Sequence, residues 1–441
     1  MRHGDSKTYR PKGGEMKSGR FRFAVLLMAS ICVVQLATSA VVSAGSESQN
    51  GPGVTPSTIR IGITYPDLSA LKNVINVDPG NYLVAYDTLI KQINAQGGLK
   101  GRKIVPVYAP VNPLGTAPAA TACTHLTEDV KVFAVLGFFQ PADTGCYVQT
   151  HDTPIIGASL TSAQAAQAKA PWFGTVISDS DLIPKEMAIF KQEGAFAGQK
   201  LGVVGTSADQ QIMNVVLSVL HKVKANVVQT AVNAAPVTDT AAQTQEYATI
   251  ASKFQSSGVT SVVAVGDSGN GWPAALQSTQ SSYHPRLIAS NYITLDAYVS
   301  NKAGHSQAIL KNALTAGGYP PASIVWNDPA MKRCIARIQK AEPNAPINNP
   351  VTSSSTTSMN WVAPEVACQQ MALFSDFARA AGKTLNNHTL SKAASSLGHI
   401  AVPGGGGSFQ FPSGSGDGNG PVFVYAWNPA QDTLQLKTTA G

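Results

Sequence analysis

Apolar residues along the chain fall into short uninterrupted runs, and amphipathic stretches separate one run from the next. Short apolar runs bounded by turn residues are typical of strands that are covered on both faces. A first series of such strands is expected at 59–64, 104–108, 132–136 and 154–156. A second series follows at 200–204, 226–228, 261–265 and 286–289. Strands that alternate with helices predict parallel sheets with helices on both faces.

The stretches between these runs repeat their apolar residues at helical spacing. In 81–96, for example, Leu83, Tyr86 and Ile90 recur three or four residues apart, and Gly97 supplies a helix stop. Further helices are expected at 117–128, 329–341, 360–381 and 385–397. After them come a glycine-rich turn, a Phe-Gln-Phe segment, a polar loop and a strand, at 404–407, 409–411, 413–420 and 422–427.

The first 44 residues carry the pattern of a signal peptide, in which basic residues precede an uncharged run from Phe23 to Ala44. An uncleaved membrane anchor is the alternative, because about 20 apolar residues can span a bilayer. The run becomes small and polar before Ala44, which favours cleavage. Ile31 precedes Cys32 where a lipid-attachment site needs a small residue. We therefore expect export to a periplasm or to the extracellular or cell-wall space, with residues 45–56 as a flexible linker.

The leader also accounts for the basic character of the chain. The whole sequence contains 32 basic and 25 acidic residues. Residues 1–44 hold seven of the basic and two of the acidic residues, so 25 basic and 23 acidic residues remain after them. The remaining basic residues are scattered rather than grouped in a stripe. Neither a nucleic acid nor an anionic membrane is therefore implied as a partner.

Four cysteines follow the leader, and an even number in an exported chain indicates two disulfides. Three connectivities are open. We prefer the pairs of near neighbours, Cys123–Cys146 and Cys334–Cys368, each closing a loop worth about 3 kcal/mol in the chain-entropy model. A metal site is not expected, because the chain has no Cys-x-x-Cys and no histidine pair near these cysteines.

The segment Asn94–Ile104, with the sequence Asn-Ala-Gln-Gly-Gly-Leu-Lys-Gly-Arg-Lys-Ile, joins the first amphipathic helix to the second strand. In an exported chain, this segment resembles the start of the type 1 periplasmic binding proteins, which include the substrate-binding components of branched-chain amino acid ABC importers. The resemblance implies two doubly wound parallel-sheet lobes joined by a three-crossing hinge. It places 57–177 and 317–398 in lobe I, and 178–316 and 399–441 in lobe II, with crossings near Ile177, Ala316 and Gly398.

The resemblance also implies a function. Such a protein captures a small polar or amphipathic solute (an amino acid, an amide or a related small acid) in an interlobe cleft. It then delivers the solute to the permease subunits of an ABC importer, as a monomer without enzymatic activity or a cofactor. An exported ligand sensor of the same fold is an alternative. A hydrolase is a weaker one, because Gly266–Gly269 matches the Gly-Asp-Ser-Gly of trypsin-like proteases but no histidine motif accompanies it.

Candidate ligand contacts follow from the rule that ligands of open α/β sheets bind at the carboxyl ends of strands. After the first strand, Tyr65 can stack on a ligand and Asp67 can accept from an ammonium group, although Asp67 can equally cap its own turn. After the third strand come Phe139 and Gln140. The next residue, Pro141, stands where similar proteins carry ligand-binding serines, and proline has no N–H to donate.

Three later turns complete the set of candidate contacts. Ser159 and Thr161 occupy the position of the family's carboxylate-binding segment, although Thr161 also fits a plain helix N-cap. In the second lobe, Asp209 lies in a turn after a strand where the family often has a ligand-facing aromatic residue, which is absent here, and Asp267 follows a later strand and can meet a cationic group. Tyr292 follows the last strand of the second series and is placed to cover the pocket.

Overall fold

The computed structural model describes residues 49–69, 77–113, 117–140, 143–236, 238–301, 304–353 and 358–440, without the side chains of 179 and 180. The predicted signal peptide at 1–44 lies outside these residues. Within the described residues, no helix combines the length and the apolar character needed to cross a membrane. The described chain contains a six-stranded sheet, a seven-stranded sheet and a two-stranded hairpin.

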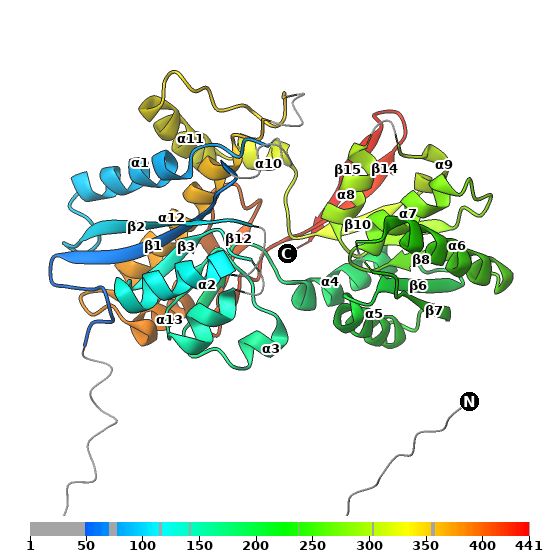
Figure 1. Ribbon diagram of the computed structural model, residues 1–441, viewed down its shortest axis with the longest axis horizontal. Helices are drawn as coiled ribbons and strands as arrows, with labels where there is room; N and C mark the ends of the chain where they lie inside the picture. Colours follow the sequence, from blue (N-terminus) through cyan, green and yellow to red (C-terminus); the bar gives the residue numbers. More distant parts are fainter. Residues whose placement is uncertain are drawn as a thin grey trace, which may run out of the picture. The chain divides into compact units, whose positions relative to one another are not determined.

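The first sheet is parallel throughout, with the strand order β13-β5-β4-β3-β1-β2. Its strands are β1 (Thr58–Pro66), β2 (Lys103–Val111), β3 (Ala134–Gly137), β4 (Ile155–Ile156), β5 (Trp172–Gly174) and β13 (Gly416–Asp417). One face packs on α1 (Tyr82–Ala95), α11 (Pro329–Ala341), α12 (Val362–Ala381) and α13 (Asn387–Ser396). The other face packs on α2 (Ala117–Thr124) and the π-helical turns His125–Asp129 and Cys146–Thr150. Figure 1 shows α1 and α2 on opposite sides of β1 and β2.

The segment that carries the family resemblance has a structural role at the end of α1. The Asn94 side chain accepts from the backbone N–H of Ile104 at 2.7 Å and donates to the Ile104 carbonyl at 2.8 Å. Gly98 has φ +74°, and a Cβ there would lie 2.0 Å from the Arg102 carbonyl oxygen. Only glycine fits this turn, which explains why the pattern marks the junction between α1 and β2.

The second sheet has the order β15-β14-β10-β9-β8-β6-β7, in which β14 and β15 run antiparallel at one edge. Its strands are β6 (Leu201–Thr206), β7 (Val227–Asn233), β8 (Ser261–Ala264), β9 (Arg286–Ala289), β10 (Leu314–Gly317), β14 (Val422–Asn428) and β15 (Thr433–Ala440). One face packs on α4 (Asp179–Gln192) and α5 (Gln210–Lys222). The other packs on α6 (Thr240–Ser256), α7 (Ser268–Ser278), α8 (Tyr292–Ser300) and α9 (Gln307–Leu310).

The chain passes between the two sheets three times, and we name each lobe by its sheet. Lobe I is 49–174 and 322–417, and lobe II is 179–317 and 422–440, so the crossings are 175–178, 318–321 and 418–421. The first two lie close to Ile177 and Ala316. The third corrects the expected crossing near Gly398, because β11 (Ile400–Ala401) and β12 (Ser408–Phe409) form a hairpin whose apolar side chains join the core of lobe I.

The expected flexible linker is also corrected over the residues that are described. The backbone N–H of Gly51 donates to the Leu385 carbonyl at 2.8 Å, and Asn50 Oδ1 accepts from the Leu385 N–H at 3.0 Å. The Thr55 carbonyl accepts from the Arg102 side chain at 2.9 Å. Residues 49–56 therefore form part of lobe I, since their backbone groups are paired with two distant segments.

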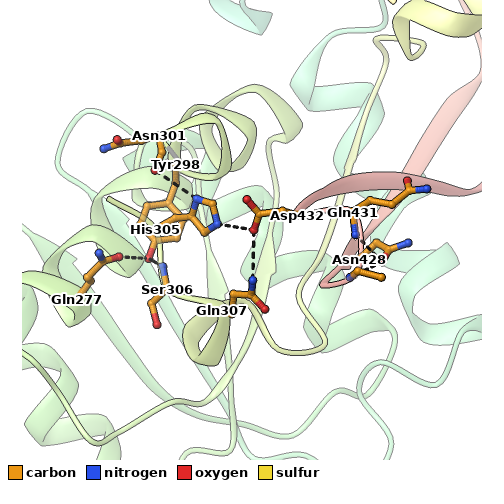
Figure 2. A network of polar contacts seen from close by, with 10 residues as sticks. Gln277, Tyr298, Asn301, His305, Ser306, Gln307, Asn428, Gln431 and Asp432 are labelled. Carbon is orange, nitrogen blue, oxygen red and sulfur yellow. Dashed lines mark hydrogen bonds and ion pairs between the residues drawn. The ribbon is translucent and has the colours of Figure 1, made fainter. Parts of the chain in front are cut away.

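The turn between β14 and β15 is attached to the rest of lobe II through His305 (Figure 2). The His305 ring lies between the Asn301 carbonyl oxygen, 3.2 Å from Nδ1, and Asp432 Oδ1, 2.9 Å from Nε2. The ring also meets Trp427 edge-on, with the ring centres 5.5 Å apart. With a side chain only 4% exposed, His305 joins the loop before α9 to the terminal hairpin.

Candidate ligand-binding cavity

A cavity of about 490 Å³ lies at the carboxyl ends of strands from both sheets. Lobe I contributes Phe139 and the turn after β4, and the first crossing contributes Val176–Ser178. Lobe II contributes residues of α4 and α5, the start of α8 and the end of β10. The full lining is Phe139, Thr144, Gly157, Ala158, Ser159, Leu160, Thr161, Ser162, Val176, Ile177, Ser178, Leu182, Ile183, Gln211, Ile212, Val215, Asn291, Tyr292, Ile293, Ala316, Gly317, Gly318 and Tyr319.

The cavity wall is mainly apolar. Among the described residues that line it, none is acidic, basic or histidine. Ile293 and Tyr319 are 50% and 46% exposed, although large hydrophobic side chains are usually covered. An apolar wall with a few neutral polar groups is typical of pockets that bind small molecules.

Four of the residues expected to bind ligand line this cavity: Phe139, Ser159, Thr161 and Tyr292. The Ser159 hydroxyl has one long hydrogen bond, 3.5 Å to the Val176 carbonyl, so much of its capacity remains for a solute. The Thr161 hydroxyl is engaged with Gln164 in a capping box at the start of the short helix α3 (Ser162–Ala165), which is the alternative that the sequence left open.

Phe139 and Tyr292 form aromatic parts of the wall. Phe139 meets the buried Tyr147 edge-on, with ring centres 5.7 Å apart. The Tyr292 ring stacks on Tyr425 at 4.2 Å, and a Cβ at Gly317 would lie 2.9 Å from the Tyr292 Cβ. Burial, together with the nearby Asp296 carboxylate, raises the pKa of the Tyr292 hydroxyl. Tyr292 therefore stays neutral and is fixed in place before any solute arrives.

The structure places the remaining lobe I candidates outside the cavity. Tyr65 lines a separate pocket of about 410 Å³ within lobe I, between the turn after β1 and residues near the end of α11. Asp67 Oδ1 accepts from the Ser69 N–H at 3.0 Å, and this hydrogen bonding lowers the pKa of the Asp67 carboxyl. The Gln140 amide donates to the Pro113 carbonyl at 2.6 Å. Asp67 and Gln140 thus hold their own loops.

Asp209 and Asp267 also lie outside the cavity lining. Asp209 Oδ2 accepts from the Thr206 hydroxyl at 2.8 Å and from the Asp267 N–H at 3.2 Å. A Cβ at Gly266, which has φ +55°, would lie 2.1 Å from Asp209 Oδ1. Burial first, and the Asp209 charge second, raise the pKa of the Asp267 carboxyl. Asp209 is therefore the anchor of the turn after β8.

Apart from the four predicted contacts, the residues that line the cavity were not predicted to bind ligand, and one supporting residue was missed as well. Among the lining residues that were not predicted, Gln211 and Ile212 belong to α5, and Asn291 directly precedes Tyr292. The supporting residue is Gln370 of α12, which is 3% exposed. Its only sequence signal is a polar side chain on the apolar side of an amphipathic helix.

The Gln370 amide fixes the turns that carry Phe139 and Ser159. Its Oε1 accepts from the Gly137 N–H at 2.5 Å and from the Tyr86 hydroxyl at 2.8 Å, and its Nε2 donates to the Gly137 carbonyl at 3.1 Å. Gly157 has φ +109°, and a Cβ there would lie 1.9 Å from Gln370 Nε2. One side chain of α12 thus holds the turn after β3 by hydrogen bonds and packs closely against the turn after β4.

Both preferred disulfides, Cys123–Cys146 and Cys334–Cys368, are present in lobe I. Within the described chain, the Cys123 and Cys146 sulfurs and a ring nitrogen of His151 form the one group of three side chains with the spacing of a metal site, within 4.8 Å of one another. Metal ions bind the thiolate form of cysteine. Because both sulfurs are in a disulfide, this group is not a metal site in the oxidised protein.

Comparison with known proteins gives one family and many similar structures. The family model described as periplasmic binding protein matches residues 58–433. An ABC transporter substrate-binding protein from Desulfitobacterium hafniense in complex with Leu is 16% identical with a TM-score of 0.58, over 86% of this chain and 100% of that chain. A fatty acid ABC transporter substrate-binding protein from Thermomonospora curvata is also 16% identical with a TM-score of 0.58, over 88% and 93%.

A third similar structure has an aromatic acid bound. The solute-binding protein of an ABC transporter from Rhodopseudomonas palustris HaA2, in complex with p-hydroxybenzoic acid, is 14% identical with a TM-score of 0.60, over 87% of this chain and 97% of that chain. No curated protein matches this chain. At these identities the likeness establishes the fold, and the ligands named for the three structures remain properties of those proteins.

Proposed function

The chain belongs to the periplasmic binding protein family, and we propose that it is the solute-binding component of an ABC importer. In this proposal it captures a small polar or amphipathic solute, such as an amino acid, an amide or a related small acid, in the cavity between the lobes. It delivers the solute to permease subunits in the membrane and performs no chemistry on it. The family and its solved relatives are extracytoplasmic substrate-binding proteins, which supports this assignment.

The observation that carries the proposal is the cavity itself, because both lobes contribute to its wall. Ser159 comes from lobe I, whereas Ile212 and Tyr292 come from lobe II. A solute that contacts both lobes stabilises the closed arrangement by the difference between its affinities for the closed and open states. Closure of two lobes about crossing segments is an established mode of domain motion.

The serine of the Gly-Asp-Ser-Gly sequence also supports binding rather than hydrolysis. Ser268 is fully buried, and its hydroxyl lies 2.9 Å from the Tyr247 hydroxyl. A serine nucleophile needs a base within hydrogen-bond reach and access to a substrate. Ser268 is covered by its own helix and core, and it is absent from the cavity wall.

The first test is a thermal-shift screen of the purified mature protein with amino acids, amides, aromatic acids and short-chain acids, followed by calorimetric titration of each hit. A solute at about 100 times its dissociation constant adds roughly 2.7 kcal/mol to the folded state. Two tyrosines make a matched pair for locating the site. Tyr292→Ala should weaken a hit by at least about tenfold, as expected for loss of a buried aromatic contact, whereas Tyr65→Ala should leave its affinity unchanged.

Two results would contradict the proposal. Conversion of any hit into a product would show an enzyme, and equal losses from both tyrosine variants would place the site elsewhere. Uptake of the labelled hit by cells with and without the gene then separates transport from sensing. Uptake that does not depend on the gene, despite tight binding, would favour the sensor alternative.

A further inference from the structure

The described wall of the cavity is uncharged, although a zwitterionic amino acid brings two charges into any site that encloses it. The polar side chains in the lining are hydroxyls and amides, and no carboxylate is among those described. Once closure removes water, an ammonium group without a counter-charge is costly to bury. We infer that the solute is amphipathic, with an apolar body and an acceptor-bearing head (a carboxylate, carbonyl or hydroxyl), and that it has no ammonium group. This inference rests on the proposed function, because closure is what encloses the solute.

Asp296, the lobe II carboxylate that contacts the cavity wall, is hydrogen-bonded to the Tyr292 side chain and is therefore committed to the protein. Asp209 accepts from the Thr206 hydroxyl and from the Asp267 N–H, at 2.8 and 3.2 Å. Asp267 lies beside this carboxylate and does not line the cavity. An ammonium group would have to break the Asp209 hydrogen bonds to gain this partner.

Asn291 shows which kind of head the cavity accepts. Its Oδ1 caps α8 by accepting from the Ile293 N–H at 2.9 Å and from the Thr294 N–H at 3.4 Å. The cap fixes the orientation of the amide, so its NH₂ group remains as a donor at the cavity wall. A donor attracts a carboxylate or carbonyl oxygen and repels an ammonium group. Ser159, with one long hydrogen bond, supplies a hydroxyl on the opposite lobe.

The size and apolar lining of the cavity fit a branched or aromatic body. Pockets for small organic molecules hold roughly 300–1,000 Å³, and this cavity holds about 490 Å³. Phe139, Ile177, Ile212 and Tyr292 supply apolar surface from both lobes and from the crossing between them. Among the described lining residues, amide and hydroxyl donors are available to a carboxylate, whereas no anionic side chain is available to an ammonium group.

The test uses pairs of solutes that differ only in the amine: leucine against 4-methylpentanoate, and phenylalanine against 3-phenylpropanoate. Calorimetric titration of the mature protein at pH 7 should give at least about tenfold tighter binding of the amine-free member, since truncating the partner of a buried charge typically costs that much or more. An amino acid that binds as tightly as its amine-free partner, or more tightly, would overturn the inference.

The variant Asn291→Asp tests whether the preference for the amine-free acid over the amino acid depends on the Asn291 amide. Aspartate caps a helix as well as asparagine does, so α8 keeps its start while the donor becomes a carboxylate. The variant should shift the preference toward the amino acid by at least about tenfold. The matched control is Asn428→Asp, because Asn428 Oδ1 also accepts from two backbone N–H groups but lies at the end of β14, outside the cavity lining (Figure 2). An unchanged preference in Asn291→Asp would contradict the inference.

The outcomes separate this inference from the proposed function. Binding of leucine or phenylalanine to the wild type as tightly as its amine-free partner overturns the solute class but leaves a solute-binding protein. Failure of every member of both pairs, and of the wider screen, overturns the function and the inference with it.

Discussion

The two lobes hold their cavity-side turns with different kinds of anchor. In lobe I, the neutral amide of Gln370 pairs with both backbone groups of Gly137, which lies 233 residues earlier in the chain. In lobe II, the carboxylate of Asp209 holds Thr206, three residues away, and Asp267, 58 residues away. Both anchors approach a glycine with positive φ so closely that a Cβ could not fit.

The contrast shows how far each lobe depends on contacts between stretches that are distant in the sequence. Lobe I is built from two separate stretches of chain, and Gln370 in the later stretch positions the turn of the earlier one. Among the described residues, both disulfides also belong to this lobe. Lobe II anchors its turn within one continuous stretch of chain, with a carboxylate that raises the pKa of the neighbouring Asp267 carboxyl. The lobes should therefore respond differently to the same kinds of change.

Reduction of both disulfides should have the largest effect. Their loops span 23 and 34 residues, and the chain-entropy model gives about 3 kcal/mol for each, or about 6 in total. Hydrogen exchange measured with and without a reducing agent should show faster opening of β1 and β3, while β6 and β8 keep their protection. Equal losses in the two lobes would show that they unfold as one unit.

The substitution Gln370→Ala should cause the second largest loss of unfolding free energy. It leaves the Gly137 N–H, the Gly137 carbonyl and the Tyr86 hydroxyl without their buried partner. At about 1 kcal/mol for each lost hydrogen bond, urea denaturation should show a loss of about 3 kcal/mol in unfolding free energy. The exposed Gln210→Ala serves as the control. If solute affinity stayed intact in Gln370→Ala, the side chain would be shown not to position the cavity turns.

Asp209→Ala should cost about 2 kcal/mol in unfolding free energy, because hydrogen bonds to a charged group are lost while the repulsion between the Asp209 and Asp267 carboxylates is relieved. Urea denaturation gives the change in stability, and Asp209→Asn should recover part of it. A loss larger than that of Gln370→Ala would reverse the comparison and make the charged anchor the stronger one.

Asp267→Asn should have the smallest effect on the unfolding free energy, and the size of that effect depends on pH. The pKa of the Asp267 carboxyl is raised in the folded state, so the folded protein binds more protons than the unfolded chain. Stability is therefore lost as pH rises from the ordinary Asp range through the folded pKa. Relative to the wild type, the variant should gain stability at pH 7 and not at pH 3 in parallel urea titrations. A gain at pH 3 alone would show that burial and the Asp209 charge do not act as described.

Much of the fold was predictable because its elements have strong local patterns. The amphipathic segment 329–341 coincides with α11, and the apolar runs predicted the central strands. The strand β5 was missed because it has three residues. The strand β15 was missed because only its two leucines are large apolar residues, and they alternate with polar ones. An alternating pattern of this length does not distinguish an edge strand from a polar tail.

The candidate site was predictable only in its location. The rule for strand ends found Ser159 and Tyr292, since those turns do line the cavity. It also selected Asp209, because a carboxylate after a strand has the same sequence appearance whether it accepts from a ligand or from the backbone. The role of Gln370 depends on pairing with Gly137 across most of the chain, and no local pattern contains that information.

The pairing of β10 with β14 determines when lobe II can be completed as the chain is made. Translation produces β6 to β10 first, but the neighbour of β10 is β14, and Asp432, the partner of His305, comes later still. The ribosome must add the whole second part of lobe I before this sheet edge is covered. A nascent chain therefore exposes the β10 edge until β14 emerges, and truncation before residue 422 would leave lobe II open at that edge.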